Sequence, residues 1–130
     1  MSLGTILVVD DSLVLRTSVV ASLTKFGFQT VEAVDGLDGL KILRKMAGEI
    51  DLVLLDWFIP RCNDQEFLEM KQRDESILDI PVIMVTTAND PQRMVNAVRL
   101  GAKHYVIKPF TEPDLMKRIK QVLQLDEEIE

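Results

Sequence analysis

Apolar residues along the chain fall into five short runs of strand length, separated by stretches in which apolar and polar positions follow a helical period. Three runs, the first, third and fourth, contain no polar residue, which favours strands covered on both faces, as in a parallel sheet. The second and fifth runs are more polar and predict less buried edge strands. The expected strands are residues 6–9, 30–33, 52–55, 82–85 and 105–107.

Helix start and stop signals stand between these runs. Asn89 to Pro91 provide a capping residue and a first-turn proline, and they predict a helix over residues 90–100 that closes at Gly101. Gly27 and Gly48 are expected to end the first two helices in the same manner.

The chain ends in a further helical stretch. Thr111 is predicted to cap its beginning and Asp114 to answer that cap three residues later. Five consecutive strand–helix units imply right-handed crossovers and an α/β fold with one open, parallel, doubly wound sheet. We expect a single folded domain over residues 4–125 and an acidic tail over residues 126–130.

Length and composition agree with one soluble domain. The chain has 130 residues, of which 47% are hydrophobic and 28% charged, and no apolar run approaches the roughly 20 residues that span a bilayer. A net charge of −6 argues against direct binding of nucleic acid, which depends on clustered Lys and Arg. One cysteine, Cys62, and the lack of a secretory leader predict a cytoplasmic location without membrane contact.

Chemically reactive residues follow four of the five expected strands. Asp10 and Asp11 follow the first, Asp56 the third, Thr86 the fourth and Lys108 the fifth. In open parallel sheets the ligand site lies beyond the carboxyl ends of the strands, so these side chains are expected to converge. Carboxylates this close repel one another unless a cation offsets their charge.

Magnesium is the cation that this set of residues favours, because it takes oxygen ligands and is typically held by one or two carboxylates together with a phosphate. Zinc prefers His and Cys, and His104 and Cys62 lie far apart in the sequence. A carboxylate, a metal, a lysine and a hydroxyl are the parts of a phosphoryl-transfer site. Asp56, alone on the central strand, is the expected nucleophile.

This ordered set of residues, with "LLDWFIP" around Asp56 and "GAKHYVIKPF" around Lys108, resembles the receiver domain of two-component response regulators. It is similar to the single-domain chemotaxis type, and the resemblance covers essentially the whole chain. The resemblance implies a flavodoxin-like fold with the strand order 2-1-3-4-5.

The resemblance also implies a role for each site residue. Asp10, Asp11 and Asp56 hold Mg²⁺ together with the backbone carbonyl of Phe58. Asp56 accepts a phosphoryl group from a phosphohistidine on a sensor histidine kinase or a histidine phosphotransfer protein. Lys108 and the hydroxyl of Thr86 then bind the phosphoryl oxygens.

A switch is implied in the same way. As Thr86 moves toward the phosphate, Tyr105 turns inward and reshapes the face formed by the fourth helix, fifth strand and fifth helix, which controls a downstream output protein or domain. The protein is then a signalling switch, not a turnover enzyme, although it catalyses its own phosphorylation and dephosphorylation. The Lys108–Pro109 bond is expected to be cis, and the protein to be a monomer or a phosphorylation-dependent dimer.

Four positions depart from the family pattern or tune it. Asp64 stands where a glycine is usual, so either the turn holds a left-handed Asp or the loop differs. Thr87 stands where Ala or Gly is commoner beside the phosphate. Phe58 and Ala88 occupy the two positions that tune dephosphorylation, and neither orients a water, which predicts slow loss of the phosphoryl group.

Other functions are compatible with parts of the pattern. A haloacid-dehalogenase-like phosphatase would need a second Asp where Phe58 stands, and a flavin carrier would need a Ser/Thr/Gly-rich loop where the chain has Asp10 and Asp11. The stronger alternative is a pseudo-receiver that keeps the fold without cycling phosphate. Thr86 is also an ordinary strand residue, and Tyr105 an ordinary edge-strand aromatic.

Overall fold

The computed structural model describes residues 3–56, 63–86 and 91–125, which form a single five-stranded parallel sheet. The strand order is β2-β1-β3-β4-β5, which confirms the order implied by the resemblance. Each predicted strand is confirmed to within one residue at either end. The strands are β1 Thr5–Val9, β2 Gln29–Ala33, β3 Leu52–Asp56, β4 Val82–Thr86 and β5 His104–Ile107.

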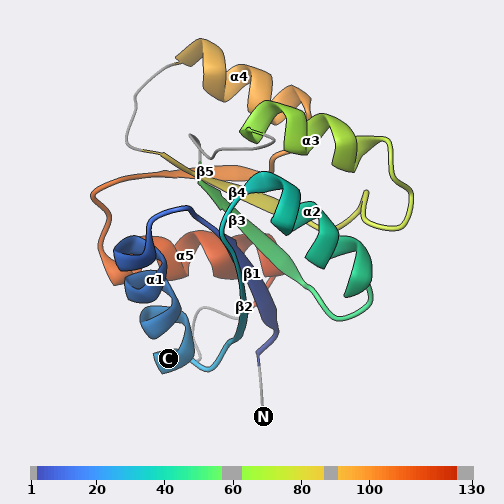
Figure 1. The fold of residues 1–130 in the computed structure, drawn as a ribbon. Helices are drawn as coiled ribbons and strands as arrows, with labels where there is room; N and C mark the ends of the chain where they lie inside the picture. Colours follow the sequence, from blue (N-terminus) through green and yellow to red (C-terminus); the bar gives the residue numbers. More distant parts are fainter. Residues whose placement is uncertain (1–2, 57–62, 87–90, 126–130) are drawn as a thin grey trace.

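Helices cover both faces of the sheet (Figure 1). One face carries α2, α3 and α4, and the other carries α1 and α5. Strands β1, β3 and β4 are buried along most of their length, whereas the edge strands β2 and β5 each have a single buried position and are less buried, as predicted. The helices are α1 Leu13–Lys25, α2 Gly36–Lys45, α3 Asp64–Gln72, α4 Pro91–Arg99 and α5 Glu112–Leu123.

Two of the three predicted glycine stops are confirmed. Gly27 and Gly101 follow α1 and α4 with φ angles of 99° and 106°, in the region that only glycine adopts without strain. The prediction for Gly48 was wrong, because α2 already ends at Lys45 with Met46 as its cap. The carbonyl of Met46 accepts the amides of residues 49 and 50, so this turn closes without a left-handed glycine.

The starts of two helices explain two other parts of the sequence. Thr111 and Asp114 form the predicted reciprocal cap of α5. Asn63 caps α3, accepting from the amide of Glu66 at 2.9 Å while its own amide donates to the Glu66 carboxylate at 3.1 Å. Asp64 is consequently the first residue of a right-handed helix, so this loop differs from one built on a left-handed residue.

Candidate functional site

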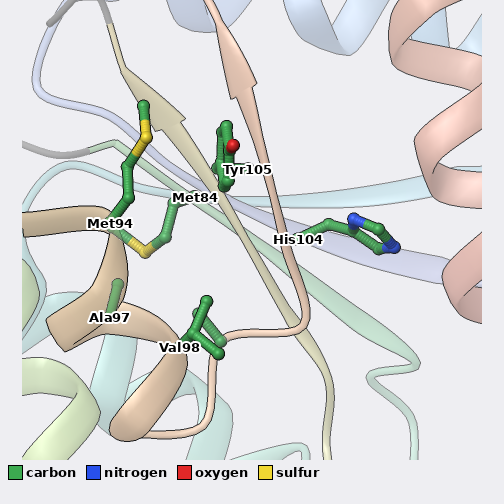
Figure 2. Close-up of a pocket in the computed structure, with 7 residues that line it drawn as sticks. Met84, Met94, Ala97, Val98, His104 and Tyr105 are labelled. Carbon is green, nitrogen blue, oxygen red and sulfur yellow. The ribbon is translucent and has the colours of Figure 1, made fainter. Parts of the chain in front are cut away.

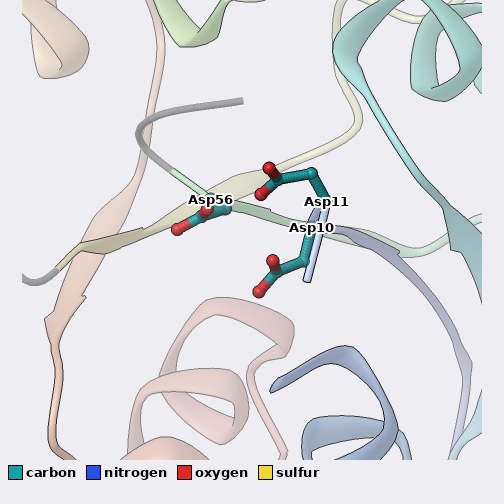
Figure 3. A group of neighbouring side chains, drawn as sticks. All are labelled: Asp10, Asp11 and Asp56. Carbon is teal, nitrogen blue, oxygen red and sulfur yellow. The ribbon is translucent and has the colours of Figure 1, made fainter. Parts of the chain in front are cut away.

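Three carboxylates meet at the carboxyl ends of β1 and β3 (Figure 3). Val9 pairs with Leu55 in the sheet, so the residues that follow them, Asp10 and Asp56, emerge side by side. Oxygen atoms of Asp10, Asp11 and Asp56 lie within 4.8 Å of one another. Asp10 is buried, Asp56 is half-buried and Asp11 is exposed, so the cluster reaches the surface at Asp11.

Lys108 supplies a positive charge to this acid cluster, defined as Asp10, Asp11 and Asp56. Its Nζ lies 3.2 Å from Oδ1 of Asp56 and 3.7 Å from Oδ2 of Asp10, and its side chain is only 12% exposed. The backbone amide of Lys108 also donates to the carbonyl of Thr86 at 2.6 Å. The end of β5 is thereby held against the end of β4, which fixes the base of the lysine side chain beside the cluster. The peptide bond between Lys108 and Pro109 is cis, as the resemblance implies.

Thr86 is the last residue of β4 and is fully buried. Asp56 pairs with Val85, so Thr86 stands one residue beyond the level of Asp56 on the neighbouring strand. The structure therefore places Thr86 at the same edge of the sheet as the acid cluster and Lys108, as the sequence predicted.

Tyr105 lies farther from the cluster, in the middle of β5, and is 41% exposed. Figure 2 shows its ring on the side of β5 that faces Met84 and Met94, while His104 points to the other side of the strand. Tyr105 and the two methionines line one small pocket between β4, β5 and α4. His104 stands at the amino end of β5 and takes no part in the acid cluster.

Asp10 is held at three of its atoms. Its amide donates to the carbonyl of Ala33 at 3.1 Å, and its carboxylate Oδ1 accepts from the amide of Ser12 at 2.9 Å. Its backbone carbonyl accepts from Nη1 of Arg16 at 2.7 Å. Arg16 was not among the residues predicted from the sequence. The available signal was its position three residues before Val19 and seven before Leu23, which places a charged residue on the apolar face of α1.

The segment that follows Lys108 is anchored as well. Glu112, at the start of α5, accepts from the Ser22 hydroxyl at 2.7 Å and from Nζ of Lys25 at 3.1 Å, both on α1. The hydrogen bond from Ser22, followed by that from Lys25, lowers the pKa of Glu112. These bonds tie the start of α5 to α1.

An all-oxygen donor set of three carboxylates suits Mg²⁺, which prefers oxygen ligands and leaves several positions to water. The remaining predicted ligand, the carbonyl of Phe58, lies outside the described residues, as do Thr87, Ala88 and Cys62. Within the described residues no helix is both long and apolar enough to cross a membrane.

Comparison with known proteins is consistent with this geometry. Residues 6–120 match the family model of the response regulator receiver domain. The phosphate regulon transcriptional regulatory protein PhoB of Escherichia coli is 36% identical over 119 residues, which are 92% of this chain and 51% of PhoB. The chain thus spans about half the length of its PhoB relatives.

Shorter relatives match over nearly their whole length. The chemotaxis protein CheY-3 of Vibrio cholerae is 33% identical over 120 residues, covering 92% of this chain and 91% of that protein. The crystal structure of CheY4 from Vibrio cholerae superposes with a TM-score of 0.85 at 26% identity, covering 93% of this chain and 99% of CheY4.

Proposed function

The chain belongs to the response regulator receiver family, whose members act in phosphorylation-controlled signalling, and we propose that Asp56 is the residue that accepts the phosphoryl group. The observation that carries this proposal is the convergence of Asp56 with Asp10, Asp11 and Lys108 at one edge of the sheet. Asp56 ends the central strand β3 and is half-buried beside the exposed Asp11, which supports access of a donor from the surface.

The transfer forms one covalent bond to the protein, at Asp56. A carboxylate oxygen of Asp56 attacks the phosphorus of a phosphohistidine, the phosphorus–nitrogen bond breaks with its electron pair going to the imidazole, and a proton from solvent keeps the leaving imidazole neutral. Lys108 is placed to offset the negative charge of the transferred oxygens, and Asp10 and Asp11 to hold the metal. The receiver domain of the sensor histidine kinase PA1611 from Pseudomonas aeruginosa holds a magnesium ion in its active-site cleft, and an ion bound by the acid cluster here would supply the remaining charge neutralisation.

Regulation follows from the same residues. We propose that the hydroxyl of Thr86 binds the phosphoryl oxygens and that Tyr105 is the residue that switches conformation. The face formed by α4, β5 and α5 is the proposed contact surface for the output protein or domain. A sensor histidine kinase or a histidine phosphotransfer protein is the proposed donor, and the cytoplasm the proposed location. We propose residues 4–125 as the receiver unit and catalysis of its own phosphorylation and dephosphorylation as its chemistry.

The proposal is tested by incubating the protein with acetyl phosphate, with and without Mg²⁺, and measuring intact mass. We expect a gain of one phosphoryl group that requires both Mg²⁺ and Asp56, so that Asp56→Asn gains none. Asp51→Asn is the matched control, because Asp51 lies at the opposite end of β3 and accepts from the amide of Thr5 at 2.8 Å. The absence of any mass gain under all conditions would contradict the proposal and favour the pseudo-receiver.

The decline of the added mass after the donor is removed tests the expected slow loss of the phosphoryl group. Loss of the phosphoryl group within seconds would contradict this expectation.

A further inference from the structure

Arg16 is a buried cation directly behind the acid cluster. Only 8% of this residue is exposed, although it stands in the first turns of α1, where neighbouring residues 13–15 are exposed. Its Nε pairs with Oε1 of Glu32 at 2.9 Å, and its Nη1 donates to the backbone carbonyl of Asp10 at 2.7 Å. Burial of a guanidinium is costly unless it is paired and hydrogen-bonded, so these two partners explain why the charge is tolerated.

The bond to the Asp10 carbonyl acts on the geometry of the cluster. Since a peptide unit is planar, fixing this carbonyl also fixes the orientation of the Asp10–Asp11 peptide. The Asp10 amide is bound to Ala33 and its Oδ1 to the amide of Ser12. Oδ2 of Asp10 is the oxygen that lies 3.7 Å from Nζ of Lys108. Arg16 thus completes a frame that orients this oxygen toward the cluster.

Only an arginine can make both contacts at once, because its planar fork presents two donors in fixed directions whereas lysine offers a single ammonium. Arg16 lies on α1, Glu32 on the edge strand β2 and Asp10 after β1, so the fork joins three elements. The carboxylate of Glu32 also balances the positive charge of Arg16. Without this balance the guanidinium would repel a divalent cation held by Asp10.

We propose that Arg16 and Glu32 form a positioning pair that sets the affinity of the acid cluster for Mg²⁺. This inference rests on the proposed function, since it concerns the metal of the same site. Groups that orient metal ligands without touching the metal typically change affinity by about 10- to 100-fold when they are altered.

The test is isothermal titration calorimetry, which measures the Mg²⁺ affinity of the full chain at a temperature below the thermal unfolding midpoint of each variant. Arg16→Lys keeps the charge and removes the fork, and we expect it to weaken binding at least about tenfold. Glu32→Gln leaves a hydrogen-bond acceptor but unbalances Arg16. Because the side chain of Glu32 is 46% exposed and screened, we expect a smaller loss of about threefold. Arg44→Lys is the control, since Nε of Arg44 pairs with Asp74 at 2.8 Å away from the site, and it should bind as wild type does.

Phosphoryl uptake from acetyl phosphate provides a second readout. At saturating Mg²⁺, Arg16→Lys should gain one phosphoryl group like wild type, with only the half-maximal Mg²⁺ concentration raised. Wild-type affinity in Arg16→Lys, alongside a lowered unfolding midpoint, would show a merely structural role and overturn the inference. If Arg16→Lys does not fold, wild-type affinity in Glu32→Gln overturns it instead. Absence of Mg²⁺ binding by wild type itself would overturn the proposed function, and the inference with it.

Discussion

Lys108 and a divalent cation bound as proposed would compete for the same oxygens. The ammonium lies 3.2 Å from Asp56 and 3.7 Å from Asp10, largely shielded from water, so its charge is weakly screened. We predict that Lys108→Met binds Mg²⁺ roughly tenfold more tightly than wild type, because the carboxylates lose a competing charge. Isothermal titration provides the measurement. Lys103→Met, an exposed lysine that precedes β5, is the control and should leave the affinity unchanged. Weaker Mg²⁺ binding by Lys108→Met would contradict this prediction. It would show that the lysine mainly holds the carboxylates in place and does not mainly compete with Mg²⁺ for them.

Residue by residue, the parts of the site that could be predicted are those that follow strands. Asp10, Asp11, Asp56, Thr86 and Lys108 were found because parallel strands bring their carboxyl ends to one edge. The support behind them could not be found in this way. The helical spacing of Arg16 could have indicated that it is buried, but its partners, a backbone carbonyl six residues earlier and a carboxylate on an edge strand, leave no pattern in the sequence.

At the scale of elements, two glycines that look alike in the sequence should respond differently to substitution. A Cβ at either Gly48 or Gly101 meets nothing within 4 Å, so crowding plays no part. Gly101 has a φ of +106°, where an alanine is strained, whereas Gly48 lies outside the left-handed region. We predict that Gly101→Ala lowers the free energy of unfolding by about 1–2 kcal/mol. Gly48→Ala should leave it unchanged or raise it by about 0.5 kcal/mol. Urea denaturation measures both, and equal effects would contradict the assignment of α4 and α2 ends.

The same pair explains which helix ends could be predicted. A glycine after an apolar period signals a stop only where the chain turns through the left-handed region, as at Gly27 and Gly101. After α2 the turn is closed instead by backbone hydrogen bonds to the carbonyl of Met46. Such a turn cannot be predicted from the sequence, because it does not require a particular side chain.

For the whole molecule, the number and burial of the strands followed from their composition, but their order did not. Apolar runs without polar positions showed that β1, β3 and β4 are central, and the more polar β2 and β5 that they are edges. Nothing in those runs states that β1 lies between β2 and β3. That order came from the resemblance, and the pairing of β1 with both strands confirms it.

A buried lysine should make the free energy of unfolding of the whole domain depend on pH in the alkaline range. Lys71 on α3 is 6% exposed and donates to the carbonyl of Leu78 at 2.9 Å, and desolvation lowers its pKa from 10.5 to about 8. Between pH 8 and 10.5 the unfolded chain holds this proton and the folded protein does not, so stability rises with pH across that window. Lys71→Met lacks the group, so comparison with it cancels the other titrations. We predict that the free energy of unfolding of wild type, relative to Lys71→Met, is about 2–3 kcal/mol higher at pH 10 than at pH 7. Guanidinium denaturation at the two pH values measures this difference, and an equal difference at both would mean that Lys71 stays protonated throughout.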